Sequence, residues 1–151
     1  MLPFHVSELG WWVLRIALAF WASQVIHELG HALVGKYYRL SITDFRLSLL
    51  DAQVAFRRTA HYENLCRNPW VRLMLAGSGC AANGLIAITC FGWLWWREPG
   101  AGESFVQALG YCNLIAALMI FVCWEDPQQD SNRCKEALAD ILERRRHAQR
   151  D

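Results

Sequence analysis

Two long runs without a charged residue constrain the fold of this chain more than any other feature. They cover residues 73–96 and 104–124. An α-helix needs about 20 apolar residues to cross the roughly 30 Å hydrocarbon core of a bilayer, and both runs are long enough. A third apolar stretch is interrupted only by Arg15 and by a cluster of histidine and glutamate. We therefore predict three transmembrane helices, over about residues 10–35, 70–96 and 104–124.

Two alternatives account for the apolar runs without a membrane. A signal peptide is disfavoured because the N-terminus has no basic region and no small-residue cleavage site. A buried helical bundle in water is disfavoured because the single domain that we expect, residues 1–151, is 54% hydrophobic with very long uncharged runs. Tryptophans near the ends of the apolar runs are typical of an aromatic belt at a membrane interface. They are Trp11, Trp12, Trp93, Trp95 and Trp96.

The basic residues predict how these helices are oriented. Nearly all of the 15 Lys and Arg residues lie in residues 36–72 and in the tail after residue 131. Three crossings put both segments on the same side, which the positive-inside rule makes cytoplasmic. We expect an integral, multi-pass protein of a bacterial inner (plasma) membrane, with its N-terminus outside and its C-terminus in the cytoplasm. The net charge of only +1 disfavours a nucleic-acid partner, whereas Arg144–Arg146 favour anionic lipid head groups.

Two cytoplasmic segments complete the predicted fold. In residues 40–58, apolar and polar side chains alternate on both sides of a turn at Leu50–Asp51, which predicts a β-hairpin. An irregular amphipathic loop is the alternative for this segment. Apolar residues at helical spacing predict a C-terminal cytoplasmic helix over about residues 131–148. The expected fold class is an all-α membrane protein of three transmembrane helices, with a small β-hairpin between the first and second.

The pentapeptide HELGH, residues 27–31, lies inside the first predicted span. His27 and His31 are four residues apart, so on a helix both imidazoles project from one face and can bind one Zn²⁺ at about 2.0–2.1 Å. Glu28 can act as the general base on a water that the metal activates. The alternative is a set of polar groups satisfied by helix–helix hydrogen bonds. Ionisable groups inside a membrane cost on the order of a few kcal/mol each and usually mark function, which favours the zinc site.

A catalytic zinc ion normally has three protein ligands, so one more is needed. The third predicted span runs inward and ends near Trp124, and the carboxylates that follow it emerge on the same side as the histidines. We take Asp130 as the candidate, with Asp126 and Glu125 in reserve. Asp130 has an equally weighted alternative, because an Asp followed by SNRCKEAL is typical of a helix N-cap.

Three motifs resemble the site-2 protease family of intramembrane zinc metalloproteases. HELGHALVGKYYRLSITDFRLSLL is similar to the first core helix of that family and the membrane-associated β-hairpin that follows it. LAGSGCAANGLIAI resembles the small-residue motif of the second core helix, with Gly79 and Asn83 at the glycine and asparagine positions and Cys80 in place of the usual proline. In the last core helix, Asn113 matches an asparagine and Ala116 stands where proline is expected.

The resemblance extends to DSNR, which begins at Asp130 and is nearest to the motif whose aspartate is the family's third zinc ligand. It implies zinc-dependent cleavage of a transmembrane segment of a substrate protein, with release of a fragment into the cytoplasm (regulated intramembrane proteolysis). The HELGH histidines and Asp130 would then hold zinc, and Glu28 would be catalytic. Asn83 and Asn113 are candidates for binding the substrate backbone or an oxyanion, although each could equally make a helix–helix hydrogen bond.

Two other functions stay open. The chain could be a catalytically inactive relative that acts as a membrane binding or scaffold protein, which the residues at the two proline positions favour and the intact HELGH opposes. The eroded aspartate motif, DSNR, also favours this inactive relative. The chain could also be a non-proteolytic zinc-handling factor, which would need further ligands. We expect no PDZ-like module in this chain, so substrate selection would depend on the substrate itself or on an accessory regulatory membrane protein.

Overall fold

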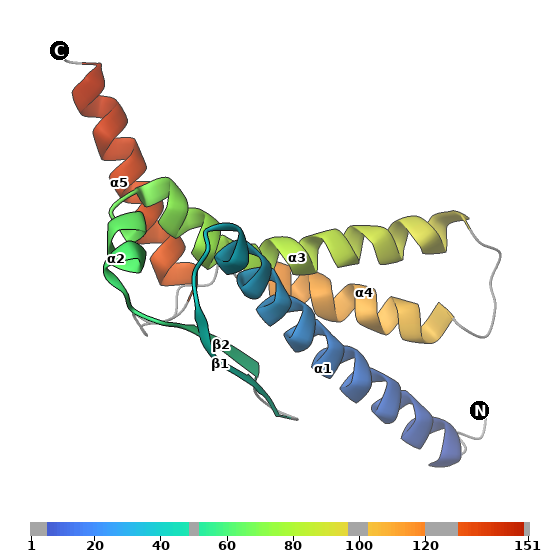
Figure 1. Ribbon diagram of the computed structural model, residues 1–151. Coiled ribbons are helices and arrows are strands. Elements are labelled where there is room, and N and C mark those ends of the chain that lie inside the picture. Colours follow the sequence, from blue (N-terminus) through green and yellow to red (C-terminus); the bar gives the residue numbers. More distant parts are fainter. Residues whose placement is uncertain (1–5, 49–51, 97–102, 120–129, 150–151) are drawn as a thin grey trace.

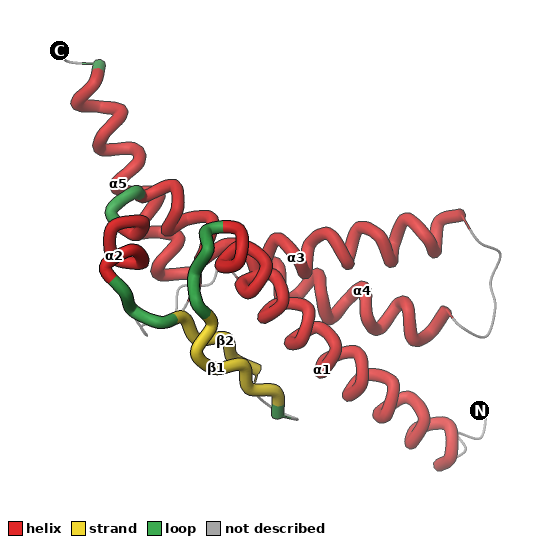
Figure 2. The backbone as a smooth tube through the Cα atoms, viewed as in Figure 1, coloured by secondary structure: helices red, strands yellow, loops and turns green. Residues whose placement is uncertain are grey.

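The computed structural model describes residues 6–48, 52–96, 103–119 and 130–149, which form helices and one small sheet (Figures 1 and 2). In chain order the elements are α1 (Val6–Tyr37), β1 (Ile42–Leu47), β2 (Ala52–Phe56), α2 (Ala60–Cys66), α3 (Pro69–Trp96), α4 (Glu103–Leu118) and α5 (Asp130–Ala148). The predictions of a mostly helical protein, of a hairpin after the first helix and of a tail helix are confirmed. The short helix α2 was not predicted.

The prediction of three spanning helices is met only in part. Within the described ranges, α1 and α3 are long and apolar enough to cross a membrane. The apolar part of α4 covers only Ser104–Leu118, which is shorter than a span. The predicted third span extends to residue 124, and residues 120–124 lie outside the described part of the chain.

The central helix of the bundle is α3, which packs against α1, α4 and α5, while α1 also packs against α4. Figure 1 shows the N-terminal end of α1, the C-terminal end of α3 and the start of α4 at one end of the bundle. The hairpin, α2 and α5 lie at the other end. We call these the apolar end and the polar end. Arg15 ties α1 to α4 at the apolar end, where its Nη1 donates to Ser104 Oγ at 2.7 Å.

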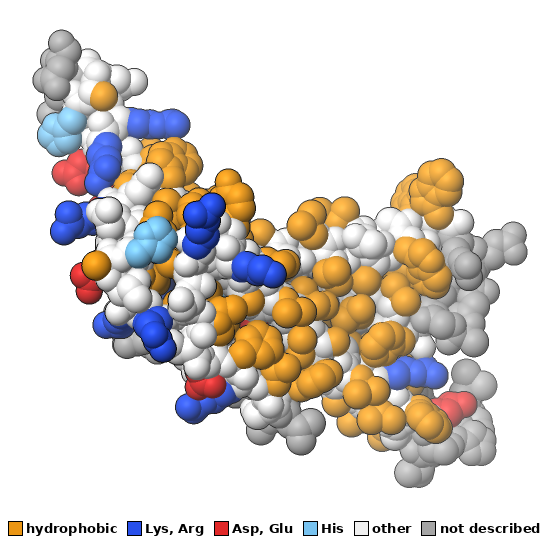
Figure 3. All heavy atoms as spheres, in the orientation of Figure 1, with side chains coloured by type: hydrophobic (Ala, Val, Ile, Leu, Met, Phe, Trp, Pro, Cys, Tyr) orange, Lys and Arg blue, Asp and Glu red, His pale blue; other side chains and the backbone are white. Residues whose placement is uncertain are grey.

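Small residues allow the helices to approach closely. A Cβ on Gly30 of α1 would lie 2.5 Å from the carbonyl oxygen of Ser78 in α3, so only glycine fits there. The residues that α3 buries are mostly small: Pro69, Val71, Ala76, Ser78, Gly79, Cys80, Asn83, Ala87 and Cys90. Its large apolar side chains point outward, with Ile88 71% and Trp96 89% exposed. In the view of Figure 3, hydrophobic side chains cover the outer surface of the helix bundle, and Lys and Arg gather towards the polar end.

The chain reverses direction directly after α1. Arg39 adopts a left-handed backbone conformation with φ 56°, and the N–H of Leu40 donates to the carbonyl of Gly35 at 2.8 Å, which closes the end of the helix. The two strands then pair antiparallel, with Phe45 opposite Val54. The predicted turn at Leu50–Asp51 lies outside the described residues.

The hairpin folds back along α1, and β2 is the strand that contacts α1 more. A Cβ on Gly35 would collide with the ring of Phe56, so this glycine lets β2 lie against the helix. Near the other end of β1, the indole Nε1 of Trp21 donates to the carbonyl of Ser48 at 3.1 Å. The hairpin therefore runs alongside the half of α1 that carries HELGH.

Helix α5 docks on the beginning of α3. Arg72 of α3 forms an ion pair with Asp140 of α5. The guanidinium of Arg145 lies 6.0 Å from the centre of the Trp70 ring, within the range of a cation–π contact. Cys134, Ala137 and Ile141 form the buried face of α5. These contacts place the first residue of α5, Asp130, next to α1.

Candidate metal centre

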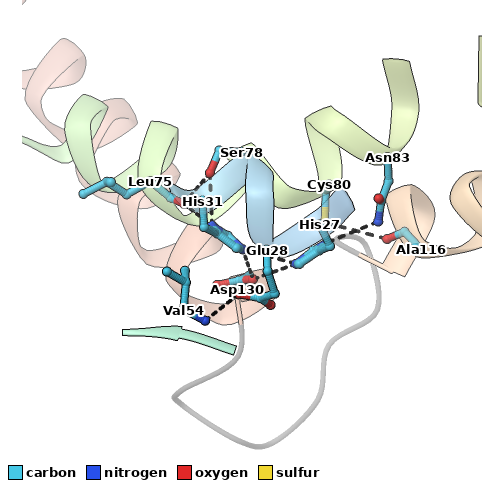
Figure 4. Close-up of polar contacts among 10 residues, drawn as sticks. All are labelled: His27, Glu28, His31, Val54, Leu75, Ser78, Cys80, Asn83, Ala116 and Asp130. Atoms are coloured by element: carbon cyan, nitrogen blue, oxygen red, sulfur yellow. Dashed lines mark hydrogen bonds and ion pairs between the residues drawn. The ribbon is translucent and has the colours of Figure 1, made fainter. Parts of the chain in front are cut away.

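Three side chains from two distant helices meet at the polar end (Figure 4). The Nε2 atoms of His27 and His31 are 3.2 Å apart, one helical turn from each other on α1. Oδ2 of Asp130 lies 3.2 Å from Nε2 of His27 and 2.9 Å from Nε2 of His31. All three are therefore potential ligands to a single metal ion. A tetrahedral zinc ion with bonds of about 2.0–2.1 Å separates its ligand atoms by roughly 3.3 Å, which is close to all three distances.

The surroundings of His31 show that its Nε2 needs a positive partner. Nδ1 of this ring lies 2.8 Å from the carbonyl oxygen of Leu75 and 3.0 Å from Oγ of Ser78. A carbonyl can only accept, so Nδ1 carries the proton and a neutral His31 has its lone pair on Nε2. That lone pair faces a carboxylate oxygen of Asp130. Two acceptors so close repel each other unless a proton or a metal ion lies between them, so the donor set fits a bound cation.

Helix α3 contacts the His27 ring on the side away from Asp130. Its Nδ1 lies 3.2 Å from Nδ2 of Asn83, which is fully buried. Gly79 gives the ring its space, because a Cβ there would lie 2.5 Å from Nε2 of His27. Helix α3 thus contacts Nδ1 of both imidazoles and packs Gly79 against the His27 ring, and both Nε2 atoms face Asp130.

The carboxylate of Asp130 is turned towards the histidines. Burial by itself would raise the pKa of Asp130, but hydrogen bonds from His27 and His31 outweigh burial and hold this pKa well below its usual range. Asp130 is also the first residue of α5. The reserve candidates, Asp126 and Glu125, lie outside the described residues. The position of Asp130 agrees with the predicted ligand, and metal binding itself stays a prediction.

Glu28 lies beside the cluster and contacts the hairpin. Its Oε2 accepts a hydrogen bond from the backbone N–H of Val54 in β2, at 2.8 Å. Val54 is a middle residue of β2, and this N–H points towards α1 and away from β1. The carboxylate of Glu28 is therefore shared between the metal site and the edge of the hairpin.

A cavity of about 580 Å³ joins these groups. HELGH contributes His27, Glu28 and His31 to its wall, and α5 contributes Asp130 and Arg133. The rest of the wall comes from β2, α2, α3 and the end of α4: Gln53, Val54, Phe56, Tyr62, Cys66, Arg72, Leu75, Ala76, Cys80, Ala116 and Met119. The lining is mixed: apolar side chains stand beside the guanidinium groups of Arg72 and Arg133 and the phenol of Tyr62.

The two asparagines that were expected to bind substrate do not line this cavity. Asn83 contacts the back of the His27 ring. Asn113 is fully buried in α4 and donates from Nδ2 to the carbonyl of Leu109 at 2.8 Å. Sequence reasoning did not identify the contacts of Leu75, Ser78 and Val54, because two are backbone groups and the third is a serine within a small-residue motif.

The two positions at which the family carries proline lie next to each other. The thiol of Cys80 in α3 donates to the carbonyl of Ala116 in α4, with sulfur and oxygen 3.7 Å apart. Both residues line the cavity. The two residues that differ from the site-2 protease pattern, which the sequence resembles, therefore form one local contact between α3 and α4.

Comparisons with known proteins add no neighbour: no family model, no curated protein and no solved structure matches the chain.

Proposed function

We propose that this protein is a zinc-dependent intramembrane endopeptidase that resembles the site-2 proteases. The observation that carries the proposal is the convergence of His27, His31 and Asp130 at ligand-to-ligand distances that suit one zinc ion, with Glu28 in the same cavity wall. A metal site made only for structure closes all four positions with protein ligands, whereas three ligands leave one position for the reaction.

The proposed setting is a membrane. Small residues face inward and large apolar residues face outward, the opposite of a protein folded in water and the arrangement that helices adopt in lipid. The apolar run 104–124, of which α4 is the described part, would supply a third crossing. The polar end then faces the cytoplasm, with the basic segments on that side, and the protein is a multi-pass protein of a bacterial inner membrane.

The reaction is hydrolysis of a peptide bond. A zinc ion at this site would supply a Lewis acid that polarises water and the scissile carbonyl. Glu28 takes a proton from the attacking water on its carboxylate and gives it to the nitrogen of the leaving amine as the C–N bond breaks. His27, His31 and Asp130 serve to hold the ion. The carboxylate of Glu28 is kept in place beforehand by the N–H of Val54.

The proposed substrate is a membrane-spanning segment of another protein. A helical peptide bond is shielded by its own hydrogen bonds, so the segment has to unwind before cleavage. Gln53, Val54 and Phe56 of β2 line the cavity, and the backbone groups of a strand can hold an extended peptide as a further strand. Such pairing would hold the unwound segment beside Glu28 and release one product to the cytoplasm.

The second candidate is an inactive relative that binds membrane proteins as a scaffold. The absence of proline at Cys80 and Ala116 is the observation in its favour. The convergence of His27, His31 and Asp130 counts against it, because a scaffold has no need of such a donor set.

Glu28→Gln tests the proposal in purified, membrane-reconstituted protein. Bound zinc is measured by elemental analysis, and cleavage is measured on a model transmembrane substrate. We expect one zinc per chain in both proteins and a loss of cleavage of at least about 100-fold in the variant, because a general base contributes roughly 10²–10⁴ to the rate. Glu63→Gln, an exposed carboxylate of α2, is the control and should cleave normally.

Three results would contradict the proposal. Unmodified protein without zinc rules out the peptidase. Cleavage by Glu28→Gln at the normal rate rules out the assigned base. Zinc-loaded unmodified protein that cleaves no membrane-spanning substrate favours the scaffold.

A further inference from the structure

Asn83 has an unusual environment for a buried amide. It reaches from α3 to the side of the His27 ring that faces away from Asp130 (Figure 4). It is 0% exposed and its Nδ2 lies 3.2 Å from Nδ1 of His27. Its Oδ1 is buried and has no hydrogen-bond partner among the described residues. An unsatisfied buried acceptor costs about 1–3 kcal/mol, and a half-turn of the amide would bring this oxygen to the His27 ring.

The orientation of the amide determines which nitrogen of His27 carries the proton. When Nδ2 of Asn83 donates to Nδ1, the proton of a neutral ring sits on Nε2. It then points at Asp130, 3.2 Å away, and prevents Nε2 from binding a metal. Rotation of the amide by half a turn places Oδ1 at Nδ1. Nδ1–H then donates to Oδ1 and the lone pair of Nε2 is free, while Nδ2 gives up its contact with the ring.

We propose that Asn83 is a positioning residue that selects the metal-binding tautomer of His27, with Oδ1 facing the ring when metal is bound and Nδ2 facing it when metal is absent. This inference rests on the zinc binding of the proposed function. It gives Asn83 a role different from the substrate or oxyanion contact expected from the sequence, and Asn83 does not line the cavity in which substrate would lie.

The two histidines then differ in how they are prepared for metal. His31 is held by the carbonyl of Leu75, which can only accept, so its Nε2 always has the lone pair in the neutral ring. His27 is held by a group that can accept or donate. Metal binding is therefore coupled to a rotation of one buried amide, which needs no repacking because the two ends of a carboxamide have nearly the same shape.

Asn113 provides a matched control. It is also 0% exposed, also lies in a long helix, and its Oδ1 is also buried without a partner among the described residues. Its Nδ2, however, donates to Leu109 of its own helix and not to a histidine. Leucine at either position has a similar volume and no acceptor.

The experiment measures the zinc affinity of the purified full chain by competition with a chelator. We expect a 10- to 100-fold loss in Asn83→Leu, the usual effect of removing the partner of a ligating histidine, and no comparable loss in Asn113→Leu. Asn83→Asp keeps an acceptor at Nδ1 and should retain the affinity. Equal affinities in Asn83→Leu and the unmodified protein, or equal losses in both leucine variants, overturn the proposal. So does an Asn83→Asp variant that loses zinc as Asn83→Leu does.

A second measurement needs no variant. In protein labelled with ¹⁵N-histidine, NMR shows which imidazole nitrogen of His27 carries the proton. We expect the proton on Nε2 in the neutral ring of the metal-free protein and on Nδ1 in the zinc-bound protein. The same tautomer in both states overturns the inference and leaves the proposed function standing, whereas failure of the unmodified protein to bind zinc overturns both.

Discussion

The contact between α1 and α3 differs from the contact between α3 and α5, although both bring candidate metal ligands to the same point. The first is made by small residues at close range, as at Gly30 and Ser78, and it fixes two histidines that one helix already spaces correctly. The second is made by an ion pair, a cation–π contact and a narrow apolar face, and it carries the carboxylate of Asp130. Helix geometry alone therefore positions His27 and His31, whereas the position of Asp130 depends on the packing of α5 against α3.

Removal of the Asp130 carboxylate should have the largest effect on zinc affinity. Asp130→Asn keeps a residue that caps helices well but replaces the carboxylate with a weaker metal ligand. We expect a loss of zinc affinity of about 100-fold or more with α5 still folded, because metal sites depend strongly on ligand charge and number. Chelator competition measures the affinity, and circular dichroism measures the helix content.

Asp44→Asn, in the exposed ion pair of the hairpin, is the control for Asp130→Asn and should bind zinc normally. Unchanged affinity in Asp130→Asn would mean that Asp130 only begins the helix, and the ligand would then have to be sought at Asp126 or Glu125.

Disruption of the α1–α3 contact should come next. A methyl group on Gly30 meets the backbone of Ser78, which cannot move away easily, so Gly30→Ala should destabilise the protein by about 1–3 kcal/mol. Gly10, in the same helix, has no neighbour within 4 Å of the place that a methyl group would occupy, and Gly10→Ala should be neutral or stabilising by up to about 1 kcal/mol. Unfolding in detergent measures both. Equal stability changes in the two variants would contradict the close contact.

Loosening of the α5 contact without loss of a ligand should have the smallest effect. Arg72→Ala removes a partly exposed ion pair, worth about 1 kcal/mol or less, and should lower zinc affinity by roughly two- to fivefold. Arg46→Ala, in the hairpin ion pair, is the control and should not change it.

Cys134 can report the same movement. Burial and the charge of Asp130 raise the pKa of this thiol to about 11, so at pH 8 only about one thiol in a thousand is reactive thiolate. In a variant whose other cysteines are replaced, Arg72→Ala should make alkylation of Cys134 faster. An unchanged rate would show that the ion pair does not hold α5.

These two contacts also explain what the sequence could predict. The hairpin and the tail helix follow local periodicity, and the pairing of His27 with His31 follows from a four-residue spacing. Topology predicts Asp130 near them, with the N-cap weighed equally. The contacts of His31 with Leu75 and of Glu28 with Val54 involve backbone groups of distant segments. Every residue has such groups, so these contacts cannot be predicted from residue type. The short helix α2, which packs on α3, also depends on tertiary contacts.

The long separation between the ligands sets the order of events during synthesis of the protein. Asp130 comes 99 residues after His31, so the donor set is incomplete until most of the chain has left the ribosome. Both long helices and the hairpin are made before the last ligand appears. A nascent chain therefore carries the two histidines and the glutamate without the complete site, and under the proposed function metal loading would be a late step of maturation.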